Sequence, residues 1–263
     1  MQRNYLKFKT GNSQIRLLQN TWHSVYQNSY DEGLRFLIKG LNFPIHSIED
    51  VVEKIEKKLP IQYILEKWSF YEGEYHINEN VLIPRPETEI LVDYIVNKFR
   101  DKKSVLDLGT GSGCIAIELS KKLRTAKITG VDLSAKAVEI AKKNSAQTEN
   151  YVNFFTSNWF SNVNQKFDLI VSNPPYMPKN SSLDESLKFE PMIALFSENQ
   201  GLADLSKIIT DSINYLQEHG VLMLEHGIGQ ENYLREKMIK EGFKKIELIK
   251  DLKDLNRFII GYR

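Results

Sequence analysis

The chain has 263 residues, enough to bury a substantial core and to hold one large domain and a smaller one. Its 35 Lys and Arg residues nearly balance its 34 Asp and Glu residues, which argues against a protein that grips long nucleic acids mainly through their phosphates. The single cysteine, Cys114, excludes an internal disulfide and a cysteine cluster for zinc, and no apolar run approaches membrane-spanning length.

Residues 1–30 are basic, with Arg3, Lys7, Lys9 and Arg16 but no Asp or Glu. This composition resembles an organelle-targeting segment, although an ordinary N-terminal helical region has the same appearance, and we favour the latter. No apolar core of a signal peptide follows the first residue. A reducing interior is therefore the expected environment of the chain.

The N-terminal part contains two segments, 31–39 and 48–59, whose apolar residues recur at helical intervals. The second segment has a single apolar stripe, made of Ile48, Val51, Val52, Ile55 and Leu59. These segments predict a small helical domain over residues 1–69. From 70 to 84, apolar residues alternate with Glu, His and Asn, which predicts a β-hairpin that connects this domain to a larger one over 85–263.

From residue 104 onward, short apolar runs alternate with helical patterns. The predicted strands are 105–108, 127–131, 152–155, 167–172 and 221–224, with helices at 115–122 and 135–144 and a closing hairpin of 246–249 and 258–261. Such alternation predicts an α/β fold, a mostly parallel sheet with helices on both faces. Ligands of such sheets bind beyond the carboxyl ends of the strands, where the strand order reverses.

The first of these strand ends carries a glycine loop, Asp-Leu-Gly-Thr-Gly-Ser-Gly at 107–113. Glycines let the backbone turn tightly and approach a ligand closely, and dinucleotide enzymes use a similar device. Asp132 ends the next strand, where a carboxylate can accept hydrogen bonds from both ribose hydroxyls. We favour this role for Asp132, although a helix cap near Ser134 is an alternative. Asp107 either caps the loop or contacts the amino-acid part of a cofactor.

The most informative motif is Asn173-Pro174-Pro175-Tyr176, directly after the apolar run 167–172. The prolines fix their own φ angles, so the Asn173 side chain and the Pro174 carbonyl point in set directions. Two acceptors and the flat ring of Tyr176 form a cradle for a planar NH₂ group. The loop has no acid or base suited to the proton relay of a nicotinamide enzyme. It therefore favours methyl transfer from S-adenosylmethionine to nitrogen.

With these motifs, the chain from about residue 60 resembles the bacterial release-factor glutamine methyltransferases. The matching stretches are 62–65, 82–89, 107–117, 157–160, 171–176, 189–191 and 225–227. The resemblance implies a Rossmann-like class I methyltransferase sheet with an antiparallel C-terminal hairpin. It also implies methyl transfer to the side-chain N5 of the glutamine in the Gly-Gly-Gln motif of class I peptide release factors.

The resemblance also assigns residues to roles. The cofactor would contact Gly109, Thr110, Gly111, Ser112, Gly113, Asp132, Trp159 and Asn173. The glutamine would contact Asn173, Pro174, Pro175 and Tyr176, with Asn173, Pro174 and Tyr176 as catalytic residues. The chain departs from the family at Asn158, where Asp is usual, and at Glu66, where Gly is common. Residues 1–60 match poorly, and this segment would dock the protein substrate.

Several of these residues have an ordinary structural alternative. Trp159 stacks on adenine or is a core tryptophan, and Tyr176 covers the acceptor amide or is a core aromatic. Arg85 contacts the cofactor carboxylate or an acidic partner, or it pairs with Glu87 or Glu89. For His226, which has no further ligands at metal-site spacing, we favour a structural hydrogen bond and expect no metal site.

Two other acceptors are compatible with the same cradle. One is a glutamine of a ribosomal protein, and the other is the N6 amino group of adenine in a nucleic acid, for which residues 177–199 are too short to form a recognition domain. A module that binds the cofactor without catalysis is a further alternative. We expect a bacterial cytoplasmic monomer, with an organellar matrix as the less favoured location, and no stable nucleic-acid or membrane partner.

Overall fold

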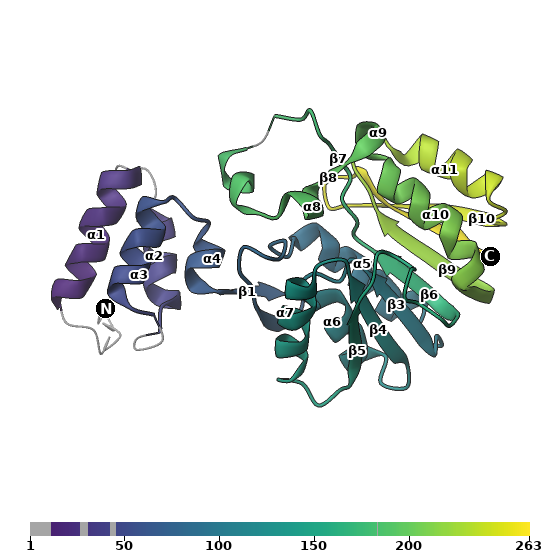
Figure 1. Ribbon diagram of the computed structural model, residues 1–263, viewed down its shortest axis with the longest axis horizontal. Helices are drawn as coiled ribbons and strands as arrows, with labels where there is room; N and C mark the ends of the chain where they lie inside the picture. Colours follow the sequence, from purple (N-terminus) through teal and green to yellow (C-terminus); the bar gives the residue numbers. More distant parts are fainter. Residues whose placement is uncertain (1–11, 27–30, 43–45, 183) are drawn as a thin grey trace. The chain divides into compact units, whose positions relative to one another are not determined.

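The computed structural model describes residues 12–26, 31–42, 46–182 and 184–263 (Figure 1). The chain forms two compact units, Met1–Lys67 and Trp68–Arg263, and each has hydrophobic clusters built from its own residues. In the acid-free segment 1–30, the described residues 12–26 are helical, and residues 1–11 and 27–30 lie outside the described part of the chain. In the described ranges, no helix is both long and apolar enough to cross a membrane.

The described residues of the smaller unit form four helices around one core. They are α1 (Asn12–Tyr26), α2 (Asp31–Gly40), α3 (Ile48–Glu56) and α4 (Ile61–Leu65). Of the predicted apolar stripe, Ile48, Val51 and Ile55 are buried in this core, and Val52 and Leu59 pack against it partly buried. The helix ends at Glu56, earlier than predicted, because Lys58 adopts a left-handed φ of 58° and Pro60 follows.

The predicted hairpin lies earlier in the chain than expected. It is formed by β1 (Lys67–Phe70) and β2 (Gly73–His76), and residues 77–85 continue as turns and irregular chain. Its aromatic residues Phe70 and Tyr75 belong to a core cluster of the larger unit. The alternation of apolar and polar residues runs on past His76, but Asn78 and Asn80 form a turn there, in which the Asn80 backbone N–H donates to the Asn78 side chain (3.0 Å).

The larger unit is built on a seven-stranded sheet of order β10-β11-β9-β6-β3-β4-β5. In chain order the strands are β3 (Ser104–Leu108), β4 (Lys127–Asp132), β5 (Val152–Thr156), β6 (Phe167–Ser172), β9 (Leu216–Glu225), β10 (Lys245–Lys250) and β11 (Asn256–Tyr262). The neighbouring strands β5, β4, β3, β6 and β9 pair in parallel, and β11 is antiparallel to both β9 and β10. The predicted α/β fold, including its closing hairpin, is confirmed.

Helices cover both faces of this sheet (Figure 1). One face packs against α5 (Pro86–Lys98), α6 (Cys114–Lys122) and α7 (Ala135–Ser145), and the other against α10 (Ala203–Tyr215) and α11 (Glu231–Lys240). Strand side chains alternate between the two clusters: Val221 and Met223 join the first, whereas Leu222 and Leu224 join the second. The β3 strand that ends in the glycine loop is therefore buried on both sides.

Short elements connect β6 to α10. They are β7 (Met177–Pro178), a 3₁₀ helix (Glu185–Phe189), α8 (Met192–Leu195), β8 (Phe196–Ser197) and α9 (Glu198–Gly201). The strand β7 pairs with β8 in parallel, so the chain that leaves the Asn-Pro-Pro-Tyr motif is tied to the chain that enters α10. This segment supplies part of the wall of the site described next.

Candidate active site

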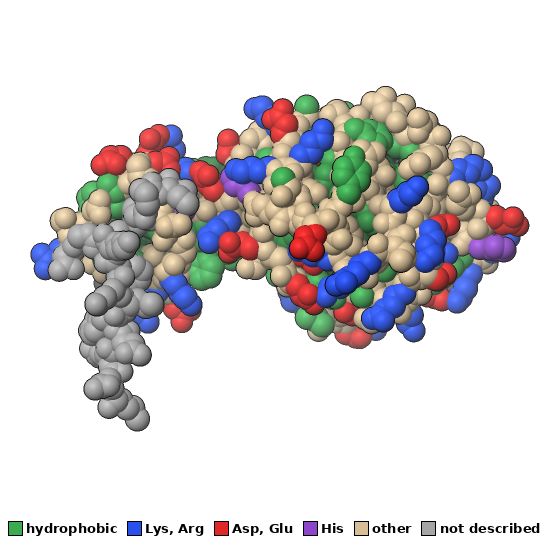
Figure 2. All heavy atoms as spheres, turned by 90° about the horizontal axis from the view of Figure 1, so that it is seen from below, with side chains coloured by type: hydrophobic (Ala, Val, Ile, Leu, Met, Phe, Trp, Pro, Cys, Tyr) green, Lys and Arg blue, Asp and Glu red, His purple; other side chains and the backbone are tan. Residues whose placement is uncertain are grey.

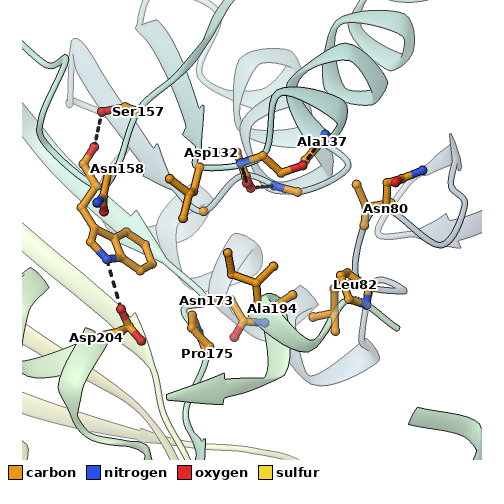
Figure 3. Close-up of a pocket in the computed structure, with 18 of the residues that line it drawn as sticks. Asn80, Leu82, Asp132, Ala137, Ser157, Asn158, Asn173, Pro175, Ala194 and Asp204 are labelled. Carbon is orange, nitrogen blue, oxygen red and sulfur yellow. Dashed lines mark hydrogen bonds between the residues drawn. The ribbon is translucent and has the colours of Figure 1, made fainter. Parts of the chain in front are cut away.

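A pocket lies at the carboxyl ends of β3, β4, β5 and β6 (Figure 3). Because β4 and β6 pair with opposite sides of β3, the strand order reverses here, as the sequence predicted for a ligand site. The predicted residues that line the pocket are Gly109, Gly111, Asp132, Trp159, Asn173 and Pro175. Those that lie in the same loops without lining it are Thr110, Ser112, Gly113, Pro174 and Tyr176.

The glycine loop turns sharply between β3 and α6. Gly109, Gly111 and Gly113 all have a left-handed φ, of 70°, 55° and 81°. A Cβ at Gly111 would meet no atom within 4 Å, whereas one at Gly113 would lie 3.0 Å from the Ala141 Cβ. Gly111 therefore leaves open space beside the backbone, and Gly113 is needed for close packing of α6 against α7.

Hydrogen bonds to the buried side chains of Asp107 and Asn144 hold this loop in place. Thr110 is buried and donates a hydrogen bond to Asp107 Oδ2 (2.6 Å). The carbonyl of Ser112 accepts a hydrogen bond from Asn144 Nδ2 (2.8 Å). Asp107 itself is fully buried, and this burial, with the nearby charge of Asp132, raises its pKa to about 7. Asp107 thus accepts a hydrogen bond from within the loop and does not line the pocket.

Asp132 lies at the end of β4 and lines the pocket (Figure 3). Its Oδ2 accepts a hydrogen bond from the Gly111 backbone (2.9 Å), and its Oδ1 accepts one from the Ser134 backbone (2.9 Å). Ser134, not Asp132, is the N-cap of α7, because its hydroxyl accepts from the Ala137 backbone. Burial raises the pKa of Asp132, and the backbone hydrogen bonds oppose that shift.

Trp159 forms a side wall with Asp204, a residue that the sequence analysis did not identify. The Trp159 indole donates to Asp204 Oδ1 (3.1 Å) (Figure 3). Ser197 donates to Asp204 Oδ2 (2.6 Å). Trp159 has a left-handed φ of 50°, an uncommon conformation for an aromatic residue. Asn158 also lines the pocket, in the position where the family usually has Asp.

The Asn173-Pro174-Pro175-Tyr176 loop follows β6 directly, as predicted. The Asn173 side-chain NH₂ donates to the Thr88 hydroxyl (3.0 Å). No described residue donates a hydrogen bond to the Asn173 side-chain oxygen, which is available to a ligand in the pocket that Asn173 lines. Pro175 lines the pocket as well.

Tyr176 points to a buried carboxylate. Its hydroxyl donates to Glu225 Oε1 (3.0 Å), and its ring packs against the core cluster on the α10 and α11 face. Burial and then the charge of Glu225 raise the pKa of Tyr176, which is therefore a neutral donor. Glu225 is 1% exposed at the end of β9, and burial raises its pKa while hydrogen bonds from Thr88 and Tyr176 oppose that shift.

The remaining wall comes from two segments far apart in sequence, residues 80–82 and 191–196. They are held together by Glu190, which accepts hydrogen bonds from the Ile83 backbone (3.0 Å) and from Arg85 Nη2 (2.6 Å). Arg85 therefore pairs with Glu190. One of our alternatives, a pair with Glu87 or Glu89, is not what the structure shows. Glu190 is buried, so this ion pair fixes the two segments against each other.

His226 is fully buried beside Glu225, and its Nδ1 lies 2.8 Å from the Gly227 carbonyl. Burial lowers its pKa, which favours the neutral ring. Among the described residues, no group of three His, Cys, Asp or Glu side chains could hold a metal ion. The geometry agrees with a structural hydrogen bond at this position.

Comparison with known proteins places this fold and site. A family model described as the methyltransferase small domain matches residues 86–189. A crystal structure of a methyltransferase from Pyrococcus furiosus aligns with a TM-score of 0.57 at 19% identity, and the alignment covers 72% of this chain and 87% of that one. The sheet order and the pocket at its strand ends, with these matches, define a class I methyltransferase fold.

Sequence relatives are more specific. The chain is 41% identical over 208 residues to the release factor glutamine methyltransferase of Buchnera aphidicola subsp. Schizaphis graminum, covering 78% of this chain and 76% of that protein. It is 36% identical over 249 residues to the bifunctional methyltransferase of Rickettsia bellii, covering 82% of this chain but only 45% of that longer protein. The chain belongs to the release factor glutamine methyltransferase family.

Proposed function

We propose that the chain transfers a methyl group from S-adenosylmethionine to the side-chain N5 of the glutamine in the Gly-Gly-Gln motif of class I peptide release factors. The observation that carries this proposal is the Asn173 amide, whose NH₂ is bound to Thr88 while its oxygen is left for a ligand in the pocket. An acceptor oxygen at this position suits a substrate that offers a planar NH₂ group.

The residues of the pocket fit S-adenosylmethionine. Space beside Gly111 admits the amino-acid end, and each Asp132 oxygen, which accepts one backbone hydrogen bond, keeps a further lone pair for a ribose hydroxyl. Trp159 offers an aromatic surface for adenine, and Thr110, Ser112 and Gly113 support the loop from behind. When bound, S-adenosylmethionine supplies a methyl group that its sulfonium has already activated.

The chain's own contribution to catalysis is orientation of the acceptor. The lone pair of an amide nitrogen is delocalised into its carbonyl, so the nitrogen is a poor nucleophile. The Asn173 oxygen and the Pro174 carbonyl would each accept one amide hydrogen, which holds the nitrogen in place and returns electron density to it. Orientation of this kind lowers the activation barrier by about 7 kcal/mol or more in well-aligned systems. Pro175, which lines the pocket, would enclose the amide, whereas Tyr176 lies in the same loop outside the pocket lining.

No general base is required by this arrangement. The carboxylates that line the pocket are Asp132 and Asp204, and both are engaged in hydrogen bonds with the protein. A methylated amide that carries a positive charge loses its proton readily to water. The neutral dipoles of Asn173 and Pro174 suit the positive charge that develops on nitrogen.

The smaller unit, residues 1–69 in the domain division that the sequence suggests, would dock the release factor. Its separate core supports a role apart from the nucleoside pocket. Translation termination in the bacterial cytoplasm is the setting that this function implies. On the face in view in Figure 2, Lys and Arg side chains stand among Asp and Glu side chains, which supports a protein over a nucleic acid as substrate.

The test is to incubate the chain with labelled S-adenosylmethionine and, in parallel, a class I release factor, a ribosomal extract and DNA. We expect label in the release factor, and none in a release factor whose Gly-Gly-Gln glutamine is replaced by alanine. Label in a ribosomal protein alone would assign the chain to a different glutamine substrate. Label in DNA alone would assign it to adenine methylation.

A further inference from the structure

Three residues from distant parts of the chain form one hydrogen-bonded row behind the pocket. Glu225 ends β9, Thr88 lies in the first turn of α5, and Asn173 follows β6. The Thr88 hydroxyl donates to Glu225 Oε2 (2.7 Å) and accepts from Asn173 Nδ2 (3.0 Å). Thr88 and Glu225 are 3% and 1% exposed, so water does not compete for these bonds.

The direction of every hydrogen bond in this row follows from its buried end. Each of the two Glu225 carboxyl oxygens accepts one hydrogen bond, Oε2 from the Thr88 hydroxyl and Oε1 from the Tyr176 hydroxyl. A threonine hydroxyl has a single hydrogen, and Thr88 has given it to Glu225. Toward Asn173, Thr88 can therefore only accept, so the NH₂ of Asn173 must face Thr88 and its oxygen must face away.

This constraint matters because the two ends of an asparagine amide have nearly the same shape. A half-turn of the Asn173 side chain would exchange NH₂ and oxygen without a change in packing. The rotated amide would direct its NH₂ group at the substrate NH₂ group, so neither group could accept a hydrogen bond from the other. Orientation of the substrate nitrogen would then be lost, although the cofactor contacts of the glycine loop and Asp132 would stay in place.

We propose that Thr88 is a positioning residue whose hydroxyl, directed by Glu225, holds the Asn173 amide with its oxygen toward the methyl acceptor. The inference rests on the proposed function, because it concerns how the acceptor amide is held. It assigns to Thr88 a role that its position in the first turn of a helix does not suggest. It also explains why an acidic side chain is buried at the end of β9, beside the site but outside the pocket lining.

The test compares Thr88→Val, which keeps the shape and removes the hydroxyl, with Thr88→Ser, which keeps the hydroxyl. Single-turnover rates are measured at saturating S-adenosylmethionine with release factor as acceptor. We expect Thr88→Val to lose about tenfold in rate, the scale set by one unmade buried hydrogen bond, and Thr88→Ser to stay within about threefold of wild type. Affinity for S-adenosylhomocysteine should stay within about twofold in both.

A matched control is Thr129→Val, the same change at a buried threonine of β4 that does not line the pocket. It should leave the rate unchanged. The decisive comparison is Thr88→Val in an Asn173→Ala background, where no amide is left to orient. If Thr88 acts through Asn173, it should cause no further loss there, whereas a general structural role would lower the rate by the same factor in both backgrounds.

The outcomes separate this inference from the proposed function. A wild-type chain that methylates no release factor refutes the proposed function before any variant is compared. Wild-type activity with an unchanged rate in Thr88→Val, or with equal losses in the two backgrounds, overturns the role of Thr88 alone. Independently of any acceptor, the side-chain NH₂ signals of Asn173 in NMR spectra should show contacts with the Thr88 methyl group, and their absence would overturn the assigned orientation.

Discussion

Replacing Asp132 by alanine should weaken cofactor binding far more than it weakens the fold. The carboxylate is available to two ribose hydroxyls, and hydrogen bonds to a charged group contribute about 1.5–3 kcal/mol each. Their joint loss of about 3–6 kcal/mol corresponds to a decrease in affinity from roughly a hundredfold to roughly ten-thousandfold. The same oxygens also hold the backbones of Gly111 and Ser134, so the glycine loop loses support as well.

Calorimetric titration with S-adenosylhomocysteine measures this change. Asp168→Ala is the matched control, because Asp168 accepts hydrogen bonds from Lys103 and Ser104 and lies outside the pocket lining. It should lower the midpoint of thermal unfolding but leave the affinity within about twofold. Because burial raises the pKa of Asp132, affinity of the wild type should fall on acidification at a higher pH than for an exposed aspartate. An unchanged affinity in a folded Asp132→Ala variant would refute its role.

Four further changes test other parts of the account. Asn173→Ala should lower the single-turnover rate about a hundredfold, because one well-placed acceptor contributes about 3 kcal/mol to transition-state stabilisation. Asn173→Asp should retain more activity than Asn173→Ala. A wild-type rate in the alanine variant would contradict the mechanism. A chain that begins at Trp68 keeps both core clusters of the larger unit and should bind S-adenosylhomocysteine normally but methylate intact release factor poorly; full activity would remove the docking role. Glu66 has a left-handed φ of 55°, a conformation that glycine adopts without strain. Glu66→Gly should therefore stabilise the smaller unit by up to about 1 kcal/mol, although it removes a partly exposed ion pair with Lys54. A lower unfolding midpoint would show that the lost ion pair outweighs the relief of backbone strain. Asn158→Asp restores the family's usual charge at the pocket and should strengthen binding of S-adenosylhomocysteine; an unchanged affinity would separate Asn158 from adenine recognition.

The sheet and the glycine loop were predictable because their signals are local. The predicted strands are short and mostly apolar, and those at 105–108, 127–131 and 167–172 end directly before Gly109, Asp132 and Asn173. The spacing from Gly109 to Asp132 is set by one helix between two parallel strands. The structure confirms these strands and shows Gly109, Gly111, Asp132 and Asn173 around one pocket. The helices α10 and α11 follow the same logic, although the sequence analysis did not single them out.

The contacts that assemble the site were not predictable, because they join residues with no local signal. Thr88 and Glu225 are 137 positions apart, and Arg85 and Glu190 are 105 positions apart. Taken singly, Thr88 has the appearance of a residue in the first turn of a helix, and Glu225 that of a polar residue at a strand end. Only the fold shows that these side chains meet, and only burial shows that they must be hydrogen-bonded.

The central claim is that the chain places a methyl group on one glutamine nitrogen. Tandem mass spectrometry of a release factor, after reaction with S-adenosylmethionine and the wild-type chain, locates that group most directly. The account predicts a single methyl group on the side-chain nitrogen of the Gly-Gly-Gln glutamine, and a much smaller yield with Asn173→Ala. A methyl group on any other residue of the release factor, or the same yield with both chains, would contradict it.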